Sequence, residues 1–387
     1  MGEFLKKKLS KNVIWMSLAS MFNDISSEMI FPILPLFLAN VLNVNKSLIG
    51  LIEGIAESLG SVSKTLSGYL SDKLNRRKII VALGYSVSAI TKPLLAFSII
   101  WQHVLSIRTI DRLGKGVRDP PRDALIAASS AENVRGKSFG FHRMMDTIGA
   151  VIGTISAYVL LSFLFDYRTI FWLSFIPAAI SVVIIIFFVK EIKRKVSSVF
   201  SRFSVNHFSK NFKLFILIST IFSLANFSYA FFILRAQEFV ELAFIPLIYL
   251  LYNISYAVFA LPAGNLSDKI GRKNIIIFGY ILFGITTLNF ITIKNPSFIW
   301  LLFALYGISI AFREAVSRAF VTDLVDADKR GTALGIYYTF TGLALFPASV
   351  IAGSLWDKFG PNATFIYATI ISLVASLLLM LFVKESK

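Results

Sequence analysis

The sequence predicts an all-α integral membrane protein, with twelve transmembrane helices in two pseudo-symmetric six-helix bundles. Three observations lead to this fold class. The chain is 56% hydrophobic, with a mean hydropathy of +0.72, which lies outside the usual balance of soluble domains. Continuous apolar stretches of about 20 residues, long enough to cross a bilayer, recur along the whole chain. A short polar motif between such stretches returns after about half of the chain.

The apolar stretches define the predicted helices. They are continuous rather than alternating, which indicates helices and not barrel strands. The N-terminal bundle, residues 1–189, is expected to hold helices at 13–39, 47–70, 77–100, 103–128, 136–162 and 168–189. A basic cytoplasmic linker, residues 190–211, leads to the C-terminal bundle, residues 212–387. That bundle is expected to hold helices at 212–236, 243–266, 273–293, 297–322, 331–354 and 362–383.

The net charge of +17 follows the predicted topology. With both termini cytoplasmic, 24 Lys and Arg residues fall on the cytoplasmic side and 4 in the outer loops. This is the positive-inside bias of membrane proteins. We therefore expect a multi-pass protein of the cell membrane that contacts the lipid bilayer and binds no nucleic acid. The chain has no cysteine, which excludes disulfides, thiol catalysis and cysteine-based metal sites.

The polar motif is part of a longer internal repeat. Gly-Tyr-Leu-Ser-Asp-Lys-Leu-Asn-Arg-Arg-Lys at 68–78 returns as Gly-Asn-Leu-Ser-Asp-Lys-Ile-Gly-Arg-Lys at 264–273, a spacing of 196. Arg-Gly at 135–136 returns at 330–331, and Arg-Asp at 118–119 returns as Arg-Glu at 313–314, both with a spacing of 195. Six crossings bring the chain back to its starting side. The halves therefore form a parallel repeat.

The second copy of the motif matches the pattern G-x-x-x-D-[RK]-x-G-R-[RK] throughout, and the first departs at Asn75. This position requires a left-handed turn, which asparagine enters more readily than other non-glycine residues. On these residues, the chain resembles the major facilitator superfamily over its full length. The resemblance implies two six-helix bundles around a cavity that opens alternately to each side. It also implies a small-molecule substrate, no cofactor and a monomer.

The repeated loop motif supplies the predicted gating residues. Its glycines can let helices approach closely. Its aspartates can accept bonds from a neighbouring helix N-terminus or from the arginine four residues later, closing the cytoplasmic face. The gating set is Gly68, Asp72, Arg76, Arg135, Gly264, Asp268, Arg272 and Arg330.

Ionisable residues inside the predicted helices indicate function more strongly than the loop motif does. Inserting each one into a membrane at a helix centre costs about 2.5–3.5 kcal/mol on insertion scales. Away from the ends of its predicted helices, the first half carries 8 acids and 8 bases between residues 24 and 146, which suggests a paired network. The second half offers mainly amides, hydroxyls and aromatics, so we expect coupling in the first bundle and much of the substrate contact in the second. The predicted proton-coupling residues are Asp24, Glu28, Glu53, Glu57, Arg112 and Asp146. The predicted substrate-binding residues are Asp24, Arg112, Arg118, His142, Asn226, Tyr229, Asn253, Arg313 and Glu314.

Two helix motifs bear on the type of transporter. The stretch 112–118 resembles R-x-x-x-G-x-x of the proton-coupled members, whose arginine lies near a proton-carrying acid. Arg112 is the residue that matches, whereas Lys115 and Arg118 make this site more charged than the pattern. The segment 149–153 resembles the antiporter motif of drug-efflux members as a glycine pair alone, because Thr154 stands where proline is expected.

Together these features predict a secondary active transporter that moves a small polar or amphiphilic solute by alternating access and is coupled to protons. The main alternative is a proton-independent organic-anion exchanger or facilitator that uses Arg112, Arg118 and Arg313. Multidrug efflux, divalent-cation transport through the clustered carboxylates and a transporter-like receptor are less favoured. The chain has no G-x-x-x-x-G-K-[ST] loop, which argues against an ATP-driven pump of that class, and we expect no enzyme activity and no resident metal.

Overall fold

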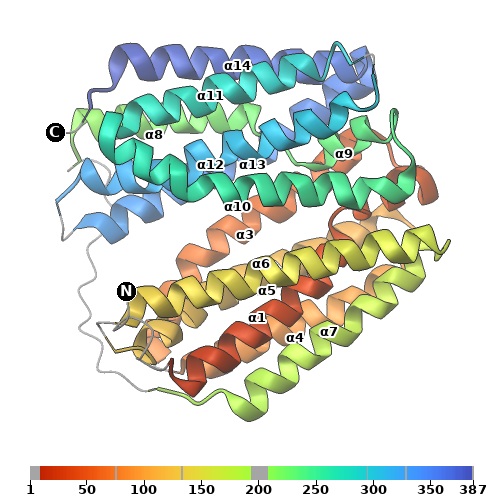
Figure 1. The fold of residues 1–387 in the computed structure, drawn as a ribbon, viewed down its shortest axis with the longest axis vertical. Helices are drawn as coiled ribbons and strands as arrows, with labels where there is room; N and C mark the ends of the chain where they lie inside the picture. The colour runs from red at the N-terminus through yellow and green to blue at the C-terminus, as the bar shows by residue number, and fades with distance from the viewer. Residues whose placement is uncertain are drawn as a thin grey trace. The chain divides into compact units, whose positions relative to one another are not determined.

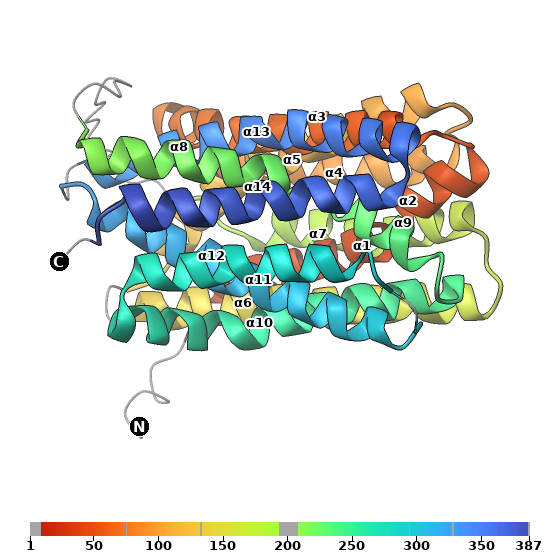
Figure 2. The same cartoon turned by 90° about the horizontal axis from the view of Figure 1, so that it is seen from above.

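The computed structural model describes residues 9–74, 76–131, 134–192, 208–293, 295–326 and 329–385. Every regular element in these ranges is helical. The chain forms two compact units, Met1–Phe37 with Leu59–Ser198 and Leu38–Ser58 with Val199–Lys387. Figures 1 and 2 show the helices of each unit from two directions. The all-helical membrane fold predicted from the sequence is confirmed, while the predicted boundaries at 189 and 211 stay predictions.

The helices begin and end within a few residues of the predicted ranges. Side chains of Ser10 and Asp166 cap the N-termini of the first and last helices of the first half, accepting from the backbone N–H of Val13 and Thr169. In order, the helices of this half are α1 (Lys11–Ile30), the short α2 (Leu34–Leu36), the π-helix η1 (Phe37–Val41), α3 (Lys46–Leu74), α4 (Arg77–Ala96), α5 (Trp101–Ala128), α6 (Arg135–Ser162) and α7 (Tyr167–Phe188).

The second half repeats this order. Helices α11 and α14 lie side by side in both views (Figures 1 and 2). The elements are α8 (Lys210–Ala225), α9 (Ala230–Ala236), the 3₁₀ turn η4 (Leu242–Phe244), α10 (Ile245–Ile270), α11 (Arg272–Asn289), α12 (Phe298–Asp323), α13 (Arg330–Phe359) and α14 (Pro361–Phe382). Within the described residues, 9 helical segments are long and apolar enough to cross a membrane. Helix α5 is not among them, and it carries eight charged side chains between residues 108 and 123.

The first helix of each half is interrupted, which the sequence analysis did not predict. The breaks lie at 31–33, between α1 and α2, and at 226–229, between α8 and α9. The first residues of these breaks, Phe31 and Asn226, are 195 positions apart, so the interruption belongs to the repeat. Pro32 has no N–H to continue the first helix. At the second break, the N–H of Ser228 donates to the Ser349 hydroxyl at 3.2 Å.

Close backbone contact joins α1 and α6 in the first unit. A Cβ built at Gly149 would lie 2.4 Å from the carbonyl oxygen of Met21, and one at Gly153 would lie 2.3 Å from that of Ile25. Small residues allow transmembrane helices to approach in this way. The glycine pair therefore has a packing role in this structure.

Replacing Gly149 with alanine is expected to destabilise the protein by about 1–3 kcal/mol, because the added methyl group must push α1 away from α6. Thermal unfolding of the purified protein measures the effect. Gly140→Ala on the same helix is the matched control, since no described atom lies within 4 Å of a Cβ there. Equal unfolding temperatures for the two variants would contradict the packing.

The first part of α3 packs along α13 within the second unit. Asp357 accepts hydrogen bonds from the backbone N–H of Lys46 at 3.0 Å and of Ser47 at 2.7 Å, and from the Ser47 hydroxyl at 2.6 Å. A Cβ at Gly50 would lie 2.1 Å from the carbonyl oxygen of Ser349. Segment 46–58 is thus held by an N-terminal cap and by direct backbone approach.

Candidate functional site

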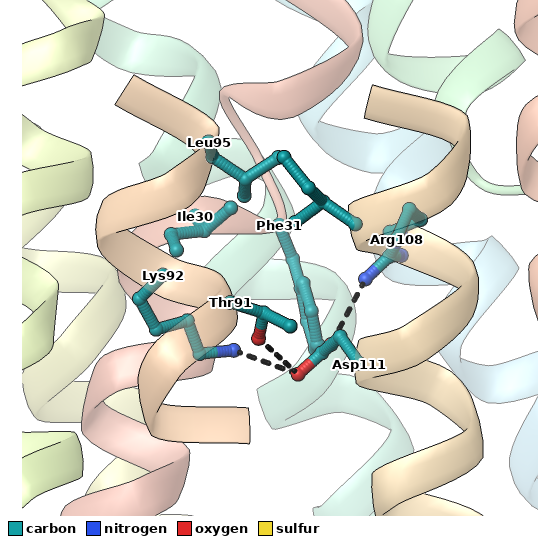
Figure 3. A pocket seen from close by; sticks show the side chains of 8 residues that line it. Ile30, Phe31, Thr91, Lys92, Leu95, Arg108 and Asp111 are labelled. Carbon is teal, nitrogen blue, oxygen red and sulfur yellow. Dashed lines mark hydrogen bonds and ion pairs between the residues drawn. The ribbon is translucent and has the colours of Figure 1, made fainter. Parts of the chain in front are cut away.

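A buried ion-pair cluster lies beside the break in the first unit. Asp111 of α5 is 3.4 Å from Lys92 of α4 and 3.8 Å from Arg108. The Asp111 carboxylate also accepts from the Ser88 hydroxyl at 2.8 Å and the Thr91 hydroxyl at 3.3 Å. Figure 3 shows Lys92, Thr91 and Arg108 converging on this carboxylate from two helices. The cluster has the paired character that the balance of acids and bases predicted.

Four cations surround the ring of Phe31, the first residue of the break. The guanidinium carbons of Arg112 and Arg108 lie 4.7 Å and 4.9 Å from its centroid, and the ammonium groups of Lys115 and Lys92 lie 5.9 Å and 6.0 Å away. These distances are those of cation–π contacts. The cavity beside the ring measures about 10 Å³, room for about one water molecule. The region is closed to a solute in this conformation.

Asp111→Asn is expected to destabilise the protein by about 3–5 kcal/mol, because it leaves the buried Lys92 ammonium without its carboxylate. Thermal unfolding in detergent measures this. Lys92→Met combined with Asp111→Asn is expected to recover much of the loss. Asp123→Asn is the control, since the Asp123 side chain is 49% exposed; a loss as large as that of Asp111→Asn would contradict the argument.

Two acids of the predicted proton-coupling set approach each other between α1 and α6. Asp24 and Asp146 are close enough to interact electrostatically, and Lys115, Arg118 and Arg122 of α5 also act on Asp24. His142 Nε2 lies 3.6 Å from Asp146 Oδ2, the contact that their spacing of one turn predicts. The histidine side chain is 6% exposed. A carboxylate pair flanked by cations can exchange protons as its surroundings change.

Asp119 organises the remaining charges of α5. Its carboxylate lies 3.6 Å from Arg118, 3.5 Å from Arg122 and 3.8 Å from Lys64 of α3. Arg118 also donates to the side chain of Asn23 at 2.8 Å and lies over the Tyr85 ring at 4.3 Å. The predicted substrate-binding residue Arg118 is therefore enclosed by partners from its own unit.

In the second unit, Arg313 lies at the other helix break. It is 7% exposed and donates to the side-chain oxygen of Asn226 at 2.8 Å. Its guanidinium carbon is 5.0 Å from the Phe222 ring and 5.8 Å from the Phe283 ring. The neighbouring Glu314 is exposed.

The other predicted polar residues of this unit lie near the same break or on α10. The rings of Tyr229 and Tyr249 are 5.4 Å apart. The side-chain amide nitrogen of Asn253 is buried, with no hydrogen-bond acceptor among the described residues. Glu53 is fully buried, and its carboxylate accepts from the Ser228 hydroxyl at 3.5 Å.

The predicted carboxylate cluster is divided between the units. Asp24 and Glu28 belong to the first, whereas Glu53 and Glu57 lie in the segment 38–58 of the second. The described residues contain no group of three or more His, Asp or Glu side chains that could hold a metal ion.

The loop motif is partly described. In the second copy, Arg272 pairs with Asp323 at 2.8 Å and with Asp268 at 3.7 Å. Gly271 has φ +96°, a positive backbone angle of the kind expected at this position. Gly264 departs from expectation, because no described atom lies within 4 Å of a Cβ built on it.

For the other predicted gating residues, the structure gives the exposure of three arginines. Arg76 and Arg330 are exposed, and Arg135 is half-buried. The side chain of Asp72, the surroundings of Gly68 and all of Asn75 lie outside the described residues.

Two glutamates that the sequence analysis missed cap the helices after the motif. Glu191 accepts from the backbone N–H of Arg77 at 3.2 Å and of Lys78 at 2.8 Å. Glu385 accepts in the same way from Arg272 at 2.8 Å and from Lys273 at 3.0 Å. The aspartates of the motif were expected to make such bonds to a helix N-terminus. The signal was available, because Val-Lys-Glu stands at both 189–191 and 383–385.

Comparisons with known proteins agree with this architecture. The family model described as Major Facilitator Superfamily matches residues 16–239 and 214–387. An uncharacterised MFS-type transporter of Methanocaldococcus jannaschii is 42% identical over 382 residues, covering 97% of this chain and 95% of the relative. The crystal structure of a nucleoside transporter superposes with a TM-score of 0.84 at 15% identity, covering 95% of this chain and 98% of that one. A POT family transporter in complex with 5-aminolevulinic acid superposes with a TM-score of 0.82 at 11% identity, covering 96% of each. The chain belongs to the major facilitator superfamily and is a membrane transporter.

Proposed function

We propose that this transporter moves a small polar or amphiphilic solute by alternating access and couples that movement to protons through the first unit. The half-buried acids of α1 and α6 support the proposal most strongly, because His142 lies 3.6 Å from Asp146 and Asp146 in turn interacts electrostatically with Asp24. Two neighbouring carboxylates repel each other when both are ionised, and one proton relieves that repulsion. A small movement of α5 would bring Lys115 and Arg122 toward the carboxylate pair or away from it. The pair would then release or bind the proton.

Other residues take supporting roles in this proposal. Arg112, Glu28, Glu53 and Glu57 extend the proton-coupling set, and His142 passes protons to Asp146. The residues around the second break, Asn226, Tyr229, Asn253, Arg313 and Glu314, contribute to substrate contact. The Arg272–Asp323 and Arg272–Asp268 pairs close the cytoplasmic ends of their helices. The protein works as a monomer in the cell membrane with both termini in the cytoplasm.

The cations around Phe31 favour one second candidate. Lys92, Arg108, Arg112 and Lys115 all lie within 6.0 Å of the ring centroid, and such a concentration suits an exchanger or facilitator of organic anions. In that case, flux would be independent of pH. A thermal-unfolding screen at two pH values separates the two candidates.

A thermal-unfolding screen of the purified protein at two pH values tests the proposal. The panel holds sugars, amino acids, dipeptides, nucleosides and organic acids. A bound solute stabilises the native state by about 2.7 kcal/mol at 100 times its Kd. We expect stabilisation by one class of solute, with an affinity that differs between the two pH values. A pH-independent affinity followed by pH-independent flux in liposomes would support the exchanger and contradict proton coupling.

A further inference from the structure

Two buried arginines occupy equivalent positions in the two units. Arg118 and Arg313 are 195 residues apart, the spacing of the repeat. A Cβ built at Gly84 would lie 2.5 Å from the Cβ of Arg118, and one built at Gly279 would lie 3.3 Å from the Cβ of Arg313. Each arginine therefore leaves its helix opposite a glycine of the neighbouring helix. The surroundings of Arg313 can therefore be compared with those of Arg118, its equivalent in the first unit.

The charge of Arg118 is balanced within its own unit. The Asp119 carboxylate lies 3.6 Å from Arg118 Nε. The Arg118 side chain is 2% exposed and the Asp119 side chain is 17% exposed. A guanidinium removed from water in this way needs a nearby negative charge to offset the loss of hydration.

Arg313 has no such balance among the described residues. No described carboxylate lies within 4.0 Å of the Arg313 guanidinium, and Glu314, the counterpart of Asp119, is exposed. The Nε atoms of both arginines are buried without a hydrogen-bond acceptor among the described residues, but that of Arg118 has the Asp119 carboxylate at 3.6 Å. Arg313 is 7% exposed, so a guanidinium N–H group without an acceptor requires an explanation here.

The surroundings of Arg313 suit part of a solute. Its side chain reaches Asn226, where α8 ends and the helix is broken. Interrupted helices form the solute sites of many secondary transporters. The buried rings of Phe222 and Phe283 flank the guanidinium, and Tyr280 stacks on Phe222 at 3.8 Å, so the arginine has an apolar wall beside it. A guanidinium binds carboxylates and other oxyanions through a planar fork of donors.

We propose that Arg313 binds the anionic group of the transported solute, a carboxylate or comparable oxyanion on a body that packs against Phe222 and Phe283. The solute then supplies the negative charge that Asp119 supplies beside Arg118. This inference rests on the transport function proposed above and narrows its solute from polar or amphiphilic to anionic. Arg313 binds the solute in the second unit, while the acid pair of the first unit handles protons.

Binding of simple aromatic anions to the purified full-length protein tests the inference. The probes are benzoate, phenylphosphonate and benzenesulfonate, with uncharged benzamide as their neutral counterpart, and the readout is the thermal unfolding midpoint against probe concentration. We expect at least one anion to stabilise the protein at concentrations where benzamide does not. Arg313→Gln is expected to weaken that binding by about 10- to 100-fold, the loss of charge-assisted hydrogen bonds. Arg313→Lys keeps the charge but loses the planar fork, so its affinity is expected to lie between the two.

Arg235→Gln is the matched control. Arg235 is also buried in the second unit, at 8% exposure, but it is paired with Glu238. Its replacement removes a cation and should leave anion binding unchanged. Stabilisation by benzamide equal to that by all three anions would overturn the inference, and so would anion binding that survives in Arg313→Gln. If Arg313→Gln does not fold, unchanged affinity in Arg313→Lys overturns it instead. No pH gradient enters this measurement, so a failure of proton coupling would leave its outcome unaffected.

Discussion

Replacing Asp24 or Asp146 with asparagine is expected to abolish proton-driven accumulation of the solute while leaving exchange down its own gradient. Asparagine has the shape of aspartate but carries no titratable proton. A pH gradient of about one unit stores about 1.4 kcal/mol per proton, which supports about tenfold accumulation with one coupled proton. In either variant the accumulation ratio should fall to unity. Uptake into liposomes with an imposed pH gradient, using the solute found in the stabilisation screen, measures this ratio.

Asp326→Asn is the control for this result. Asp326 lies in the loop after α12, is exposed, and pairs with Lys329 at 2.8 Å. Its replacement should leave accumulation unchanged. If Asp24→Asn and Asp146→Asn both accumulate solute like the unmodified protein, neither carboxylate couples transport.

A disulfide between positions 47 and 357 is expected to stop transport almost completely. Ser47 and Asp357 are in direct hydrogen-bond contact, and segment 46–58 packs along α13 in the second unit. The same helix, α3, continues into the first unit, where a Cβ at Gly60 would lie 3.4 Å from the Cβ of Arg112. In the alternating-access mechanism proposed above, α3 can follow the first unit only if its beginning leaves α13. The chain has no native cysteine, so Ser47→Cys with Asp357→Cys introduces a single pair.

Oxidation of this double variant in liposomes should block uptake, and reduction should restore it. The single variants Ser47→Cys and Asp357→Cys are the controls, because oxidation cannot join the two helices in either of them. Asp357→Cys also shows how much uptake is lost when the Asp357 cap alone is removed. Full uptake by the oxidised, cross-linked protein would show that this contact does not open during transport.

Local patterns in the sequence predicted much of the fold. Hydropathy defined the helices to within a few residues, and the spacing of His142 and Asp146 on one helix predicted their contact. The pairing of α5 charges also followed from the equal numbers of acids and bases inside the helices of the first half. These features depend on neighbours along one helix or on the requirement that membrane helices be apolar.

Features that depend on packing between distant segments were not predicted. The break at 226–229 lies in a continuous apolar stretch, where the polar residues Asn226 and Ser228 gave too weak a signal against their neighbours. The assignment of segment 38–58 to the second unit depends on contacts with α13, about 300 residues away in the chain. The helix-capping role of Glu191 and Glu385 was missed because the motif aspartates offered a nearer carboxylate. The sequence shows which residues are charged, whereas the structure is needed to identify the side chains with which each of them pairs.

Proton movement accompanying solute movement tests the central claim most directly. Liposomes containing the protein and a trapped pH-sensitive dye are given the solute without an imposed pH gradient. We expect the internal pH to change when solute enters the unmodified protein's liposomes, and to remain constant with Asp24→Asn or Asp146→Asn. Solute entry through the unmodified protein with no change in internal pH would contradict proton coupling and favour the exchanger or facilitator.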